Sequence, residues 1–216
     1  GLEPHFGCCT SNFGQGWPKF TLTSFMKTKD GFASCSIAPA ELRTKISDVP
    51  VTCELETGYP FRDSLTYKIS AEKEVPFTFS VRIPSCAKKA FVNGEEAEPG
   101  TFYKIEKVWG KEEIITLRLT FEAETVSRPN DMVAVWRGPL LYSVAIKEKW
   151  EKVEYESGGV LRKFPYCDYY IYPESKWAYA LAGEDFSLKE GSFEKGFGSD
   201  EAPVSLFADM AEISWG

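Results

Sequence analysis

Histidine is almost missing from this 216-residue sequence, in which His5 is the only one. A Ser/His/Asp set needs a histidine beside its nucleophile, and a single histidine near the N-terminus leaves little room for such a set. The sequence also lacks a glycine-rich phosphate loop and a dinucleotide-binding motif. Neither serine-hydrolase chemistry nor nucleotide-dependent chemistry is therefore indicated.

Runs of lysine and arginine are also missing, and the formal net charge is -7. A nucleic-acid-binding surface needs a basic stripe or patch, so we expect no nucleic-acid partner. No apolar stretch approaches the roughly 20 residues that a helix needs to cross a bilayer, so we expect no membrane partner. No signal peptide is present either, although a chain cut at its N-terminus would not show one.

The six cysteines have no regular spacing that would indicate a disulfide framework. In a chain of this size Cys35, Cys53, Cys86 and Cys167 are best interpreted as reduced core residues. This usage favours a reducing, cytoplasmic location.

The middle of the chain alternates apolar and polar residues. This period of two, typical of half-buried strands, occurs at 51–56, 65–70 and 77–83. Turn signals such as Asn93-Gly94 separate the expected strands. The sequence therefore predicts a mainly β fold: one or more antiparallel β-sandwiches preceded by one N-terminal helical segment. Further strands are expected at 32–38, 42–46, 90–92, 103–108, 114–119, 132–136, 140–146, 165–172 and 204–208.

The charged stretch 148–162 is instead expected to be a mobile loop. The one helix is expected from about residue 10 to residue 27, with a residue of the segment 10–12 capping its start. Pro18 either interrupts this helix or opens a second helical piece. Composition shifts divide the chain into 1–30, a β-sandwich at 31–147 and a β-rich extension at 148–216, which is separate or part of the same sandwich.

Two adjacent cysteines, Cys8 and Cys9, lie where a loop meets the expected helix. Free cysteines often behave as small buried apolar residues, and this interpretation is the simpler one. Alternatively, the positive end of a helix lowers the pKa of a thiol, and a thiolate is both a nucleophile and a metal ligand. Zinc ligand pairs are usually separated by two residues, so spacing alone favours the first interpretation.

Residues 8–12 (Cys-Cys-Thr-Ser-Asn) are followed by residues 16–20 (Gly-Trp-Pro-Lys-Phe). Together these two segments resemble the zinc-cysteine motif of glycoside hydrolase family 127, the β-L-arabinofuranosidases and their relatives. Further matching segments follow in the family's order at 56–61, 82–85, 92–94, 99–103, 137–142 and 172–181. Cys86 stands where the family has a tryptophan.

The resemblance implies a retaining mechanism in which Cys8 is the nucleophile and forms a thioglycosyl intermediate. It implies that Cys8 and Cys9 both bind zinc, together with a cysteine and a glutamate of an upstream helical barrel, and that a barrel glutamate is the general acid and base. Zinc keeps a sulfur deprotonated, so the thiolate takes the part that a second carboxylate has in most retaining glycosidases. The implied substrates are glycans ending in L-arabinofuranose or a related sugar.

Family members are much longer, so the chain is interpreted as a C-terminal fragment. Its helix would be left over from the upstream barrel, which would be its partner. Two of four zinc ligands make a weak site, so we expect the isolated chain to be inactive and to hold zinc weakly or not at all. The alternative is a non-catalytic β-sandwich module that binds carbohydrate, or that braces or oligomerises a catalytic domain.

Three residues near the cysteine pair are candidates for substrate binding, and each has a structural alternative. His5 is a lone histidine near the terminus, Asn12 is a candidate helix cap, and Trp17 is a candidate core aromatic. Without barrel partners the apolar face of the helix would be exposed, or covered in a homodimer. Aromatic residues of the β region are candidates for a sugar platform, although core positions are the favoured interpretation: Tyr59, Tyr103, Trp109, Trp136 and Trp177.

Overall fold

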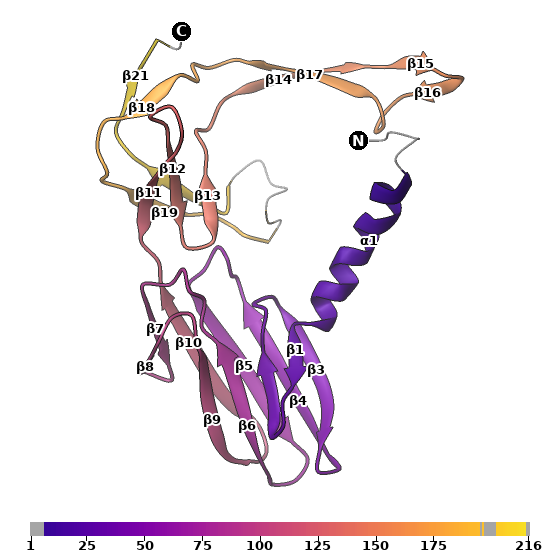
Figure 1. Ribbon diagram of the computed structural model, residues 1–216, viewed down its shortest axis with the longest axis vertical. Helices are drawn as coiled ribbons and strands as arrows, with labels where there is room; N and C mark the ends of the chain where they lie inside the picture. Colours follow the sequence, from indigo (N-terminus) through magenta and orange to yellow (C-terminus); the bar gives the residue numbers. More distant parts are fainter. Residues whose placement is uncertain (1–6, 195, 197–201, 215–216) are drawn as a thin grey trace.

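The computed structural model describes residues 7–194, 196 and 202–214. The first part of the chain after the helix forms a two-sheet β-sandwich (Figure 1). One sheet has the order β1-β2-β6-β9 and the other has the order β3-β4-β5-β10-β7-β8. These strands are β1 (Phe25–Lys27), β2 (Gly31–Ser34), β3 (Ala40–Ile46), β4 (Val49–Thr57), β5 (Ser64–Ala71), β6 (Val75–Arg82), β7 (Lys89–Val92), β8 (Glu95–Ala97), β9 (Phe102–Trp109) and β10 (Glu113–Thr120).

Neighbouring strands of the sandwich are antiparallel except β2 and β6, which run in parallel. The backbones of these two strands approach closely. A Cβ placed on Gly31 would lie only 2.0 Å from the carbonyl oxygen of Thr78. Only glycine fits at such a distance from another backbone. The predicted mainly β, antiparallel fold with one N-terminal helix is confirmed, and this parallel pair is an addition to it.

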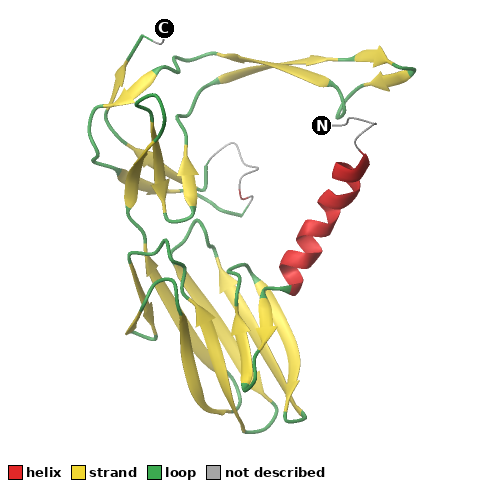
Figure 2. Ribbon diagram, in the orientation of Figure 1, coloured by secondary structure: helices red, strands yellow, loops and turns green. Residues whose placement is uncertain are grey.

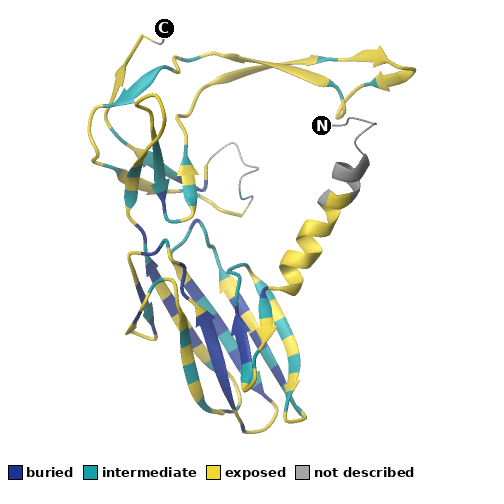
Figure 3. Cartoon of the chain, viewed as in Figure 1, coloured by how far each residue is buried: buried dark blue, intermediate teal, exposed yellow. Residues whose placement is uncertain are grey.

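The core lies between the two sheets, where the inward-facing residues of each strand are buried (Figure 3). Trp109 is fully buried at the end of β9, stacks on Phe77 with 5.1 Å between ring centroids, and donates its indole N–H to the Phe77 carbonyl oxygen at 2.9 Å. Tyr67 is equally buried, and its hydroxyl lies 3.0 Å from that of Ser34 in the opposite sheet. The polar groups of these two buried aromatic side chains therefore both have a partner, as burial requires.

The four cysteines whose side chains are described are free. Cys53 is fully buried in β4, which confirms its interpretation as a core thiol, and burial raises its pKa to about 12. The thiols of Cys35, Cys86 and Cys167 are only partly buried.

Beyond the sandwich the chain forms small separate sheets (Figure 2). The sandwich loop before β5 anchors them, because Asp63 pairs with Arg137 and the Arg62 guanidinium donates to the Gly191 carbonyl oxygen at 2.5 Å. One sheet comprises β11 (Ala123–Ser127), β12 (Val133–Arg137) and β13 (Leu140–Tyr142). Two strand pairs follow, β18 (Tyr179–Leu181) with β21 (Met210–Glu212), and β19 (Ser187–Glu190) with β20 (Val204–Phe207).

A long two-stranded arm projects from these small sheets (Figure 1). It pairs β14 (Glu148–Val153) with β17 (Asp168–Pro173), and its tip is the hairpin of β15 (Tyr155–Ser157) and β16 (Val160–Arg162). The prediction of a loop at 148–162 is therefore wrong. The tip turns at Gly158 and Gly159, whose φ angles of 61° and 75° suit a tight hairpin turn.

The helix α1 (Gly7–Leu22) starts earlier and ends earlier than predicted. It is one continuous helix that contains Pro18, so the prediction of a second helical piece is wrong. Phe25 belongs to β1 instead, because the segment 25–27 pairs with residues 32–34 of β2. No helix in the described part of the chain has the length and apolar character that crossing a membrane would require.

Candidate functional site

The cysteine pair lies in the first turn of α1, which begins at Gly7. The first turn of a helix has unpaired backbone N–H groups and the positive end of the helix dipole, an environment that favours a thiolate. The side chains of Cys8 and Cys9 and the whole of His5 lie outside the described residues. The roles of these three residues in nucleophilic attack, zinc binding and substrate binding therefore stay predictions.

Asn12 lies inside the helix, so the prediction that it caps the helix start is wrong. Its side-chain oxygen accepts a hydrogen bond from the Gln15 amide at 3.1 Å, and Gln15 in turn accepts one from the Lys19 ammonium at 3.2 Å. These bonds hold a polar ridge along the exposed helix. Asn12 is thus accessible to a ligand in the described structure.

Trp17 is 69% exposed, so its interpretation as a core aromatic is wrong for this chain. Its ring meets that of Phe20 edge-on, with 6.3 Å between centroids, and Leu22 is exposed on the same helix. As predicted for a helix without barrel partners, the described apolar side chains of its second half, Trp17, Phe20 and Leu22, are exposed. An exposed apolar surface of this kind is typical of an interface with another protein segment.

No group of three or more His, Cys, Asp and Glu side chains suited to a metal ion occurs among the residues that the structure describes. A tetrahedral zinc site needs four ligands, and the donors that this chain offers at the predicted site are the two thiols of Cys8 and Cys9. Two thiols would supply two of those four ligands, so a complete zinc site would need further ligands from elsewhere, and zinc binding stays a prediction.

The five aromatic residues considered for a sugar platform are dispersed. Trp109 is in the core, Tyr59, Tyr103 and Trp136 are partly buried, and Trp177 is exposed. Tyr103 and Trp109 share β9, where one is partly and the other fully buried, and the other three lie on a different sheet or on loops. The described structure does not bring them together into one surface.

The arm carries an exposed aromatic surface that the sequence analysis missed. Trp150 of β14 is 57% exposed, and its indole N–H donates to the Glu148 carboxylate at 2.8 Å. The Tyr169 ring lies edge-on to it, with 5.8 Å between centroids. Trp150 pairs with Ile171 and Tyr169 pairs with Lys152 in the register, which places these four side chains on one face of the ribbon.

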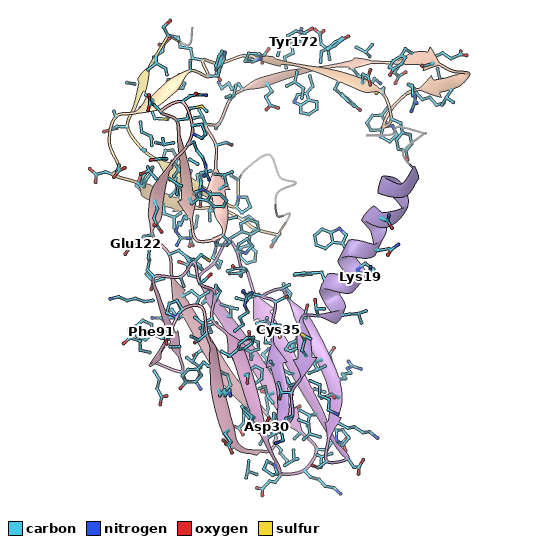
Figure 4. The ribbon with its side chains drawn as sticks, in the orientation of Figure 1. Lys19, Asp30, Cys35, Phe91, Glu122 and Tyr172 are labelled. Carbon is cyan, nitrogen blue, oxygen red and sulfur yellow. The ribbon has the colours of Figure 1, made fainter. Side chains whose placement is uncertain are left out.

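The opposite face carries Tyr170 and Tyr172, whose ring centroids are 6.5 Å apart. Figure 4 places Tyr172 on the outer side of the arm, away from the rest of the chain. Because successive residues of a strand point to opposite faces, the Trp150 face is turned toward the inner side. Trp150 lies in the stretch interpreted as a loop, whereas the three tyrosines lie in the expected strand 165–172, whose dense aromatic residues were the available signal.

Comparison with known proteins gives a consistent picture of the fold. The protein-family model described as β-L-arabinofuranosidase, GH127 middle domain, matches residues 36–121, which confirms the predicted resemblance to this family. No curated protein matches.

Solved structures resemble the chain more widely. The GH127 β-L-arabinofuranosidase Ara127N-Se from Geobacillus stearothermophilus T6 has a TM-score of 0.55 and 17% identity, covering 94% of this chain and 33% of its own. A glycoside hydrolase has a TM-score of 0.54 and 17% identity, covering 77% of this chain and 36% of its own. A GH127 β-arabinofuranosidase has a TM-score of 0.51 and 17% identity, and the match covers 94% of this chain and 34% of that structure's chain. At this identity the likeness establishes the fold, and the chain spans about a third of the length of these structures.

Proposed function

Because residues 36–121 match the GH127 middle domain, we propose that the chain is the C-terminal portion of a retaining glycoside hydrolase. The parent enzyme acts on glycans that end in L-arabinofuranose or a related sugar. The observation that carries this proposal is the family match, with the cysteine pair placed in the first turn of the helix immediately before the matched domain. The free thiols of the described part fit a reducing, cytoplasmic compartment.

In this proposal Cys8 is the nucleophile, and Cys8 and Cys9 hold zinc together with ligands of the upstream catalytic domain. Bound zinc keeps a thiol deprotonated at neutral pH. The first turn of α1 acts in the same direction, because the helix dipole favours a negative charge there. Asn12 and Trp17 lie about one and about two and a half turns beyond Cys8 on an exposed helix, and they are available to contact the glycan or the upstream domain.

The isolated 216-residue chain should release no product from an aryl β-L-arabinofuranoside and should lose any zinc to a weak chelator. In a longer protein that restores the upstream domain, Cys8→Ser should abolish hydrolysis and leave the circular dichroism spectrum unchanged. Ser11→Ala, in the same helix and the same motif, serves as the matched control and should retain activity. Hydrolysis by the isolated chain, or full activity of Cys8→Ser in the longer protein, would contradict the proposal.

One observation favours a second function, carbohydrate binding without catalysis. The inner face of the arm presents the exposed Trp150 ring, which the hydrogen bond to Glu148 orients, with the Tyr169 ring beside it. An exposed, rigid aromatic ring can stack on the apolar face of a sugar, and polar neighbours of the ring can form hydrogen bonds with the sugar hydroxyl groups.

This second function is tested by the affinity of the isolated chain for a soluble arabinan. Trp150→Ala should weaken binding severalfold, whereas Tyr172→Ala removes a ring from the opposite face and should leave the affinity unchanged. Equal effects of the two substitutions would exclude a binding site on the inner face. Binding that is unaffected by Cys8→Ser would separate this function from the catalytic one.

A further inference from the structure

A small pocket opens at the end of the sandwich where α1 joins it. Its volume is about 180 Å³, and its lining comprises Cys35, Ile37, Tyr59, Arg82, Pro84, Ser85 and Cys86. The backbone N–H of Cys35 donates to the carbonyl oxygen of Ser24 at 2.8 Å, which ties the pocket to the junction between α1 and β1. Figure 4 shows Cys35 at this end of the sandwich, near the base of the helix.

Two of the family-like sequence segments meet at this pocket. Tyr59 comes from the segment 56–61, after β4, and Arg82, Pro84, Ser85 and Cys86 come from the end of β6 and the connection after it. The segments are more than twenty residues apart in the chain, and the fold brings their side chains into one lining. Neither segment has a role in the proposed chemistry of Cys8.

The charge of the pocket is unbalanced. Arg82 is exposed at the lining and has no ion pair or side-chain hydrogen bond with any residue that the structure describes. Burial raises the pKa values of the Cys35 and Cys86 thiols, and the nearby Arg82 charge acts against that effect. The thiols are therefore mainly neutral at physiological pH, and nothing described in the pocket neutralises the guanidinium.

We propose that this pocket binds a carboxylate group. The Arg82 guanidinium offers two parallel N–H donors, which match the two oxygens of a carboxylate. The Ser85 hydroxyl supplies a further donor, while Ile37, Pro84 and the Tyr59 ring form apolar walls. The carboxylate group belongs to a free small molecule or to an acidic side chain of a second copy of the chain.

The size of the pocket supports a small ligand. Pockets for drug-sized ligands have volumes of about 300–1,000 Å³, and this pocket is smaller. A single carboxylate on a short stem suits that volume. The site is independent of the function proposed above, because it uses neither the cysteine pair nor the arm.

The two partly buried thiols provide a direct test. We would measure the rate at which iodoacetamide alkylates each cysteine of the 216-residue chain, with and without sodium glucuronate, and with sodium chloride at equal ionic strength. Glucuronate should slow alkylation of Cys35 and Cys86 severalfold, whereas chloride should not. Cys167, which is partly buried outside the pocket, is the internal control and should react at the same rate throughout.

Arg82→Gln should abolish the protection, and Arg82→Lys should retain part of it. Arg118→Gln is the matched control, because Arg118 is an exposed arginine on β10 that does not line the pocket. Protection that appears without glucuronate as the protein concentration rises, and that needs Arg82, identifies a carboxylate of a second copy as the source. Protection by glucuronate in dilute protein identifies a free carboxylate.

Three results would overturn the proposal. The first is that neither glucuronate nor a higher protein concentration slows alkylation of Cys35 and Cys86. The second is that chloride slows it as much as glucuronate does, and the third is that Arg82→Gln leaves the protection undiminished. Comparison within each variant removes the effect that the loss of a positive charge has on thiol reactivity itself.

Discussion

The pair formed by Arg137 and Asp63 connects the sandwich to the small sheet of β11, β12 and β13. Two guanidinium nitrogens donate to the two carboxylate oxygens at 3.2 and 2.5 Å. The Arg137 side chain is 8% exposed and that of Asp63 is 30% exposed. The guanidinium also lies 5.7 Å from the centre of the Phe121 ring, in the connection between β10 and β11. We predict that this pair determines how firmly the two parts are joined.

Arg137→Met should lower the free energy of unfolding by about 2–3 kcal/mol. Breaking a fully buried pair costs about 3–5 kcal/mol, because one charge is left without a partner. Asp63 keeps contact with water, so the expected loss lies closer to the roughly 1.5–3 kcal/mol of hydrogen bonds to charged groups. The substitution keeps the aliphatic stem, so little packing is lost.

Urea unfolding measures this loss, and hydrogen exchange locates it. Exchange should increase in β11, β12 and β13 more than in the sandwich, because the anchor of that sheet is removed. A double-mutant cycle with Asp63→Asn should give a coupling energy of about 1.5–3 kcal/mol.

The exposed pair of Arg43 and Glu41 is the matched control, and Arg43→Met should cause no measurable loss. If Arg137→Met were no more destabilising than Arg43→Met, the reasoning would be refuted. A uniform increase in exchange over the whole chain would refute the role of the pair as an anchor.

Three further predictions follow from single positions. Gly31→Ala should lower the urea midpoint far more than Gly110→Ala, because its Cβ would meet the Thr78 carbonyl oxygen at 2.0 Å, whereas a Cβ at Gly110 would have only the Glu74 Cγ nearby, at 4.0 Å. Equal midpoints would contradict the close approach. Cys53 has a pKa of about 12 in the folded chain against 9.0 when exposed. Its contribution to stability is therefore complete below about pH 9 and is lost as the pH rises toward 12, at about 1.4 kcal/mol per pH unit. Cys53→Val should flatten the alkaline decline of the free energy of unfolding, and superimposable pH curves would contradict this. A Cβ at Gly14 would have no atom within 4 Å. Gly14→Ala should therefore raise the helix content measured by far-UV circular dichroism, because alanine favours a helix over glycine by about 1 kcal/mol. An unchanged spectrum would contradict the description of α1 as a helix without packing partners.

The strands of the sandwich could be predicted because each has one buried face. In β4, residues such as Val51, Cys53 and Leu55 are buried and alternate with more exposed neighbours, so the sequence itself has a period of two. The arm could not be found this way, because both faces of β14 and β17 are exposed and the pattern of burial is lost. The end of α1 was misplaced because the pairing of Phe25 with Ser34 outweighs local helix preference.

The candidate sites differ in how much the sequence reveals. The cysteine pair is contiguous, so a resemblance between motifs was enough to select it. The pocket at Arg82 is assembled from three separate segments of the chain, and no spacing rule joins Cys35 to Tyr59. The motifs there indicated that the segments matter, but only the fold shows that they face one ligand-sized space.

The parallel pair of β2 and β6 constrains the order in which the chain can acquire its structure. The hairpin of β1 and β2 joins the rest of its sheet only through the pairing of residues 31–34 with residues 78–81. During synthesis, chains are made from the N-terminus and such distant contacts form late. The helix with the cysteine pair and the β1–β2 hairpin must therefore leave the ribosome long before the strand that anchors them. The segment 7–34 is therefore made before the strand that fixes it in the sheet, and it stays available to a chaperone throughout that interval.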